Sequence, residues 1–79
     1  MTQQEIFEII VRNIKEVLPN LDQHAFQSTD SMKALGLNSV DRSEVLMLTL
    51  EALSVKIPLI EMAAAPDIDA LASIIYGKL

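Results

Sequence analysis

Cysteine and tryptophan are absent from this chain of 79 residues, which also has only two glycines and six basic residues. Without cysteine it can form neither a disulfide bond nor a thiolate metal site. The six Lys and Arg residues are outnumbered by eleven Asp and Glu residues, so the net charge is −5. A surface of this charge repels nucleic acids and anionic membranes. We therefore expect no nucleic acid and no membrane as partners, and basic protein surfaces as targets.

Long apolar runs are missing as well. No stretch approaches the ~20 residues of a membrane-spanning helix, and the N-terminal MTQQEIFEII lacks the basic region of a secretion signal. We therefore expect a cytoplasmic protein. Because 51% of the residues are apolar, the chain should fold, and its length predicts one domain over residues 1–79.

The first part of the chain has apolar residues at spacings of three and four, namely Ile6, Phe7, Ile10, Val11, Ile14, Val17 and Leu18. This spacing predicts a helix over about residues 3–17 with one buried stripe. Thr2 and Glu5 can form a capping box at its start, and Pro19 with Asn20 ends it.

A long connection rich in turn-forming residues follows, from Pro19 to Asn38. It also contains the apolar residues Leu21, Phe26, Met32, Leu35 and Leu37. A loop of this length without regular structure is unusual in a compact domain. Its apolar side chains predict that it is attached to the core rather than free.

A second helix is predicted from Ser39 to about Leu53. Its inward-facing candidates include Val40, Met47, Leu50 and Leu53, whereas Asp41, Glu44 and Glu51 should face water.

Two further helical segments are predicted near the C-terminus. Pro58 suits the first position of a short helix near residues 59–63, and Pro66 ends it. A last helix begins at Asp67, a good N-cap, and ends near Gly77. It should bury Ile68, Leu71 and Ile75. The predicted fold is all-α: a monomeric bundle of three main helices plus one short helix, with a long first loop.

The segment LGLNSVDRSE, residues 35–44, opens the second predicted helix. Asn38 or Ser39 could each accept a backbone hydrogen bond there, and Asp41 adds favourable charge to the first turn. Capping alone explains these residue types. A functional interpretation of Ser39 therefore depends on the wider pattern.

Other candidate chemistry is sparse. His24 is the only histidine and has no neighbouring cluster that could bind a metal, so we expect an ordinary loop residue and no metal site. The acid pairs Asp41 with Glu44 and Asp67 with Asp69 lie in first helical turns, where carboxylates are common. Met47 and Met62 could border a bound group, although methionines at helical spacing are more often core or rim residues. We expect no catalytic residue.

Gly36, Asn38, Ser39 and Val40 form the pattern G-x-[D/N]-S-[L/I/V] after the long loop and at the start of an acidic helix. With this length, charge and helix order, the whole chain resembles the acyl carrier proteins of fatty-acid and polyketide synthesis. The resemblance implies that a phosphopantetheinyl transferase attaches 4′-phosphopantetheine from coenzyme A to Ser39, and that the thiol of this arm holds an acyl group as a thioester. A phosphodiester at Ser39 would lie beside the free N–H groups of a helix start.

The second helix differs from that of the usual fatty-acid carriers at four positions. They typically have aspartate before the serine, leucine after it and a small uncharged residue where Arg42 stands. Ser43 likewise stands where valine is common. The net charge over residues 39–56 is only −1, because the three acids Asp41, Glu44 and Glu51 are partly offset by Arg42 and Lys56.

The runs NSVDRSE and IPLIE resemble the S-[V/I]-[D/N]-R-[A/S]-E and I-P-x-[I/V]-E runs of free-standing donor acyl carrier proteins in polyketide β-branching cassettes. That resemblance implies an acyltransferase and a hydroxymethylglutaryl-synthase-like enzyme as partners, with acetyl as the acyl group donated. It also implies a partner-recognition surface consisting of Asn38, Val40, Asp41, Arg42, Glu44, Met47 and Glu61.

Several alternatives remain open at this point. The chain could be a general polyketide or fatty-acid carrier, or a carrier loaded with an amino acid. It could also be an unmodified helical adaptor that binds basic partners through its acidic surface. Arg42 could select a partner through its charge, or it could be a solvated surface residue beside Asp41 and Glu44.

Overall fold

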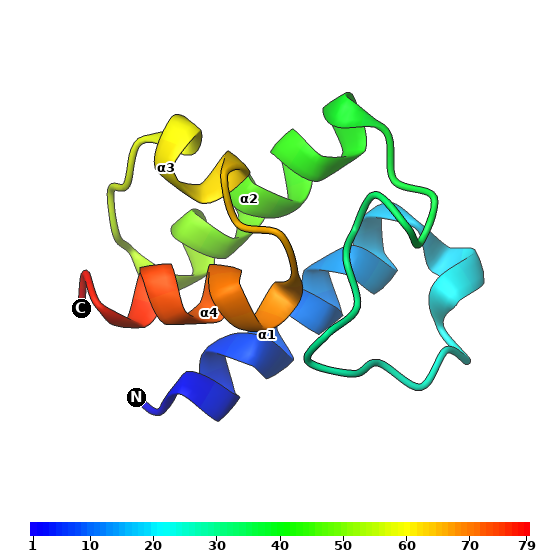
Figure 1. The fold of residues 1–79 in the computed structure, drawn as a ribbon, viewed down its shortest axis with the longest axis horizontal. Coiled ribbons are helices and arrows are strands. Elements are labelled where there is room, and N and C mark those ends of the chain that lie inside the picture. Colours follow the sequence, from blue (N-terminus) through cyan, green and yellow to red (C-terminus); the bar gives the residue numbers. More distant parts are fainter.

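Four α-helices and one short 3₁₀ turn form the fold, and there is no strand (Figure 1). The computed structural model describes residues 1–79. The elements are α1 Gln3–Val17, η1 Pro19–Leu21, α2 Ser39–Leu53, α3 Leu59–Ala63 and α4 Ile68–Tyr76. They confirm the all-α prediction, and only η1 was not expected. No helix combines the length and apolar character that crossing a membrane requires.

Helix α1 buries one stripe of isoleucines, as its spacing predicts. Ile6, Ile10 and Ile14 are fully buried. The capping box is present: Thr2 Oγ1 accepts from the backbone N–H of Glu5 at 3.1 Å, and the N–H of Thr2 donates to Glu5 Oε1 at 2.9 Å. The hydrogen bond from the N–H of Thr2 is the main cause that lowers the pKa of Glu5, and the Thr2 side chain lowers it further.

The inward face of α2 differs from the prediction. Val40 and Met47 are 72% and 53% exposed, and the buried residues of this helix are Val45, Leu46 and Thr49. Apolar residues occur on all sides of this helix, so helical spacing alone does not select one face. Packing against α1 and α3 selects it instead.

The core lies where α1 packs against both α2 and α4, with α3 beside α2 and α4 (Figure 1). Helix α4 buries Ile68, Leu71 and Ile75 as predicted, and Asp67 caps it by accepting from the N–H of Ala70 at 2.8 Å. Pro58 lies one position earlier than predicted, in the N-cap position of α3 rather than in its first turn.

One polar pair lies inside this core. Asn13 Nδ2 of α1 donates to Thr49 Oγ1 of α2 at 2.9 Å, and that hydroxyl donates to the carbonyl of Val45 at 2.8 Å. Both side chains are buried. Because each buried polar atom has a partner, the pair can fix the position of α1 along α2 without an unpaired group.

The long loop is attached to the core, as its apolar residues predict. Leu37 is buried, and Leu21, Phe26, Met32 and Leu35 pack against the core. The loop is also bonded to the start of α4, because the N–H groups of Ile68 and Asp69 donate to the carbonyls of Asp30 and Ser28 at 2.9 and 3.0 Å.

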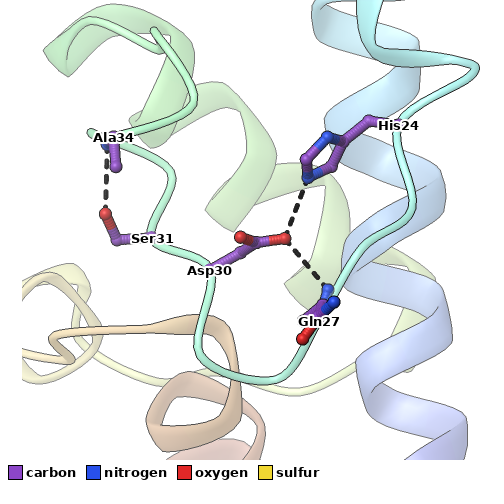
Figure 2. Close-up of polar contacts among 5 residues, drawn as sticks. All are labelled: His24, Gln27, Asp30, Ser31 and Ala34. Carbon is purple, nitrogen blue, oxygen red and sulfur yellow. Dashed lines mark hydrogen bonds and ion pairs between the residues drawn. The ribbon is translucent and has the colours of Figure 1, made fainter.

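Asp30 organises this loop internally (Figure 2). Its Oδ2 accepts from the N–H of Gln27 at 2.9 Å and lies 3.0 Å from Nε2 of His24. These contacts, the Gln27 N–H foremost, lower the pKa of Asp30. His24 therefore has a defined structural contact, which the prediction of an ordinary loop residue did not include.

Candidate functional site

A tight turn leads from the long loop into α2. The N–H of Gly36 donates to the carbonyl of Lys33 at 3.1 Å, and the N–H of Leu37 donates to the carbonyl of Met32 at 3.0 Å. Gly36 has φ of +99°, which side-chain-bearing residues rarely adopt. The glycine of the sequence pattern is thus required by the backbone that presents the residues after it.

Asn38, not Ser39, caps α2. Asn38 Oδ1 accepts from the N–H of Asp41 at 2.8 Å, and Asp41 Oδ2 accepts in return from the N–H of Asn38 at 3.4 Å. Ser39 is the first residue of the helix, is exposed, and its hydroxyl has no hydrogen-bond partner within the chain. The structure therefore decides between the two caps that the sequence allowed, and it leaves the serine oxygen free.

The start of α2 fits a phosphodiester on Ser39. The N–H groups of Asp41 and Arg42 donate to the side chain and carbonyl of Asn38, whereas those of Ser39 and Val40 have no acceptor in the chain. Unpaired N–H groups at the start of a long helix favour phosphate oxygens through hydrogen bonding and the helix dipole. The exposed hydroxyl and these two donors share one helical turn.

Arg42 has a partner within the chain. Its Nη1 donates to the carbonyl of Leu37 at 2.8 Å, and the side chain is half-buried. It forms no ion pair with either of the carboxylates near it in sequence, Asp41 and Glu44. Neither earlier interpretation included this contact: Arg42 is more than a solvated charge, because it supports the turn before Ser39.

Ser39 borders two hollows at the start of α2, and Ser43 also lines both of them. The larger, a groove of about 460 Å³, lies between α2, α3, the start of α4 and the turn at residues 31–33. Its lining includes Ser31, Met32, Lys33, Ser39, Arg42, Ser43, Leu46, Met62, Asp67 and Leu71. The other is a shallow surface depression of about 440 Å³, lined by Ser39, Val40, Ser43, Glu44 and Met47.

The structure brings most, but not all, of the predicted recognition residues together. Val40, Glu44 and Met47 line the shallow depression beside Ser39 and are exposed. Glu61 lines neither hollow, and its Oε1 pairs with Nζ of Lys78 at 3.1 Å.

The two methionines differ. Met62 is a core residue that also borders the groove, whereas Met47 is an exposed rim residue. Three of the four acids in the acid pairs have structural contacts: Asp41 accepts from the N–H of Asn38 in the capping box, Asp67 caps α4, and Asp69 accepts from Nε2 of Gln3 at 3.4 Å. No group of three or more His, Cys, Asp or Glu side chains could hold a metal ion.

Sequence reasoning missed Lys33 as a neighbour of Ser39. Lys33 lines the groove together with Ser39, although it precedes the serine by six positions in a loop without helical spacing. No pattern in the sequence indicates this proximity, because it depends on the fold of the turn at residues 31–37.

Comparison with known proteins agrees with this geometry. The family model of the phosphopantetheine attachment site matches residues 8–75. The chain therefore belongs to the phosphopantetheine attachment family, the acyl carrier proteins, which carry acyl groups on a 4′-phosphopantetheine arm and are not themselves catalysts.

Two more specific similarities cover essentially the whole chain. It is 47% identical to the polyketide biosynthesis acyl-carrier-protein AcpK of Bacillus subtilis (strain 168), over 100% of this chain and 96% of that protein. Its structure also matches a chain in the crystal structure of the curacin biosynthetic pathway HMG synthase in complex with acetyl donor-ACP. The TM-score is 0.94 and the identity 38%, over 99% of this chain and 100% of that one. These findings confirm the resemblance to donor carriers.

Proposed function

We propose that this protein holds an acetyl group as a thioester on a phosphopantetheine arm at Ser39, and donates it to a hydroxymethylglutaryl-synthase-like enzyme in polyketide β-branching. The observation that carries the proposal is the chain-long structural likeness to the acetyl donor-ACP complex. The exposed, unbonded hydroxyl of Ser39 supports it independently. Residues 1–79 then act as one monomeric carrier domain.

The loading step needs only an accessible serine oxygen. A phosphopantetheinyl transferase forms the bond from Ser39 Oγ to phosphorus while the pyrophosphate bond of coenzyme A breaks. Adenosine 3′,5′-bisphosphate leaves, and the hydroxyl proton is released. The cap by Asn38 keeps Ser39 free for this step. When attached, the arm supplies the thiol that the cysteine-free chain lacks, and an acyltransferase can load it with acetyl. Tethering raises the effective concentration of the acetyl group at a docked enzyme.

We assign the selection of partner enzymes to the face of α2 beside Ser39. Val40 and Met47 offer exposed apolar contacts, and Glu44 adds a charge next to them. Asn38 and Asp41 bond to each other in the cap, so they shape the helix start that the partner meets. Glu61 pairs with Lys78 and would act by holding α3 in place.

The proposal is tested by loading followed by transfer. Apo protein is treated with a broad-specificity phosphopantetheinyl transferase and acetyl coenzyme A, and intact mass reports the acetyl arm. A hydroxymethylglutaryl-synthase-like enzyme and an acceptor carrier holding a β-ketoacyl chain are then added. We expect loss of the acetyl mass over time. An unchanged mass after the first step would favour an unmodified adaptor, and loading without transfer would favour a general polyketide or fatty-acid carrier.

The role of Arg42 needs two variants, because its hydrogen bond to Leu37 and its charge are separate properties. Arg42→Gln removes the charge and keeps N–H donors, whereas Arg42→Glu reverses the charge and removes the donors. If Arg42 meets an acidic group of the synthase, both variants should weaken transfer, Arg42→Glu by about 1–3 kcal/mol. If Arg42→Gln transfers acetyl as fast as the wild type at low salt, the charge of Arg42 does not contribute to partner recognition, and its role is to support the turn.

A further inference from the structure

The two hollows beside Ser39 differ in charge. The groove is bordered by Lys33 and Arg42, and Asp67 is its only acidic residue. The carboxylate of Asp67 already accepts from the N–H of Ala70. The shallow depression has Glu44 and no basic residue. Two of the six basic residues in a chain of net charge −5 therefore lie on one side of the candidate attachment serine.

We infer that Lys33 and Arg42 hold the phosphodiester of the arm on the groove side of Ser39, so that the arm leaves the protein toward α3 and the turn at residues 31–33. This inference rests on the proposed attachment at Ser39. It adds a direction to the arm and assigns a ligand contact to Lys33.

Both basic residues line the groove that Ser39 also lines, and both have donors to spare. The turn that carries Lys33 is fixed by hydrogen bonds from the N–H of Ala34 to Ser31 Oγ at 3.0 Å, drawn in Figure 2, and from the N–H of Gly36 to the carbonyl of Lys33. Lys33 forms no ion pair. Arg42 uses Nη1 for the carbonyl of Leu37. A guanidinium has five N–H donors, so donors remain for a phosphate oxygen.

The charges favour one side for the anion. A phosphodiester carries one negative charge, which Glu44 repels and the two basic side chains attract. Exposed pairs of this kind are worth a few tenths to about 1 kcal/mol, so each basic residue should favour the groove side by about two- to fivefold. The exposed side chains of Val40 and Met47 then stay uncovered by the arm while it is in the groove.

The inference is tested on the loaded protein by comparing ¹H–¹⁵N NMR spectra of apo and holo forms. Intact mass first establishes that the arm is attached. We expect shift changes at residues 32–34, at 63–67 and at the Arg42 Nε–H group, in addition to those around Ser39, and small changes at residues 44–47. Because the contact is electrostatic, the changes at 63–67 should shrink as NaCl is raised well above 0.1 M.

Lys33→Glu and Lys56→Glu form a matched pair, since both change the net charge equally and Lys56 lines neither hollow. Lys33→Glu should reduce the arm-induced changes at 63–67 by at least about half, and Lys56→Glu should leave them as in the wild type. Changes confined to residues 38–41 of the wild type, or equal in both variants, would overturn the inference while leaving attachment intact. An unchanged mass for the wild type would instead refute attachment, and the inference with it.

Discussion

Replacing Asn38 by alanine removes the cap of α2 and leaves Ser39 in place. The N–H of Asp41 loses its 2.8 Å hydrogen bond to Asn38 Oδ1, whereas the weaker bond from the N–H of residue 38 to Asp41 survives, because its donor is a backbone atom. Loss of such a cap costs about 0.5–2 kcal/mol of unfolding free energy. For a domain of this size, 1 kcal/mol lowers Tm by about 4–8 °C.

Ser39→Ala is the matched comparison. The serine hydroxyl is exposed and unbonded, so its removal should change the unfolding free energy by no more than about 0.5 kcal/mol. The two variants should therefore separate stability from loading. Asn38→Ala should melt earlier and still gain the arm, and Ser39→Ala should melt like the wild type and gain none.

Circular dichroism melts and intact mass after transferase treatment measure the two effects on the same samples. Loading should be followed well below the Tm of the less stable variant. A Tm for Ser39→Ala that falls as far as that of Asn38→Ala would refute the assignment of the cap. Loading of Ser39→Ala would refute the assignment of the attachment site.

Three further changes test contacts at the turn before Ser39, in the core and in the long loop. Gly36→Ala should lower the free energy of unfolding by about 1–2 kcal/mol, because alanine is strained at φ of +99° although no atom would clash with its Cβ. Chemical denaturation measures this, and an unchanged stability would contradict the strain argument. Asn13→Ala should lower the free energy of unfolding by about 1–3 kcal/mol, because it removes the hydrogen bond to Thr49. The double variant Asn13→Leu with Thr49→Val should lose less stability than the sum of the two single variants, and denaturation of all four proteins in a double-mutant cycle measures the difference. Hydrogen bonds lower the pKa of folded Asp30 below its unfolded value, so its contribution to stability is full above about pH 5 and is lost as pH falls through the folded pKa. Asp30→Asn should thus weaken the acid dependence of unfolding, which chemical denaturation at a series of pH values measures; an unchanged acid dependence would contradict the argument.

Helix positions could be predicted closely from local patterns. The isoleucine stripe and the Thr2–Glu5 capping box define α1, and Asp67 marks the start of α4. These signals lie within a few residues of the feature they determine. The buried face of α2 could not be predicted, because its apolar residues do not form a single stripe and only contact with the other helices places Val45 inside and Val40 outside.

The site shows the same division. The pattern around Ser39 and the glycine before it could be recognised from the sequence, since both belong to one continuous segment. The contact of Arg42 with the carbonyl of Leu37, and the place of Lys33 in the groove, depend on the conformation of the turn. The pairing of Glu61 with Lys78 joins α3 to the C-terminal segment after α4, across 17 positions, and nothing in the local sequence indicates it.

The exposed apolar side chains of α2 and α3 also affect how the protein behaves at high concentration. Val40, Met47 and Ile60 all face solvent. At neutral pH the net charge of −5 keeps copies apart by mutual repulsion. Near the isoelectric point of about 4.5 that repulsion vanishes, and apolar contacts between copies can then drive precipitation. The colloidal stability of this carrier thus depends on its acidic residues, because the surface that we assign to its partners contains exposed apolar side chains.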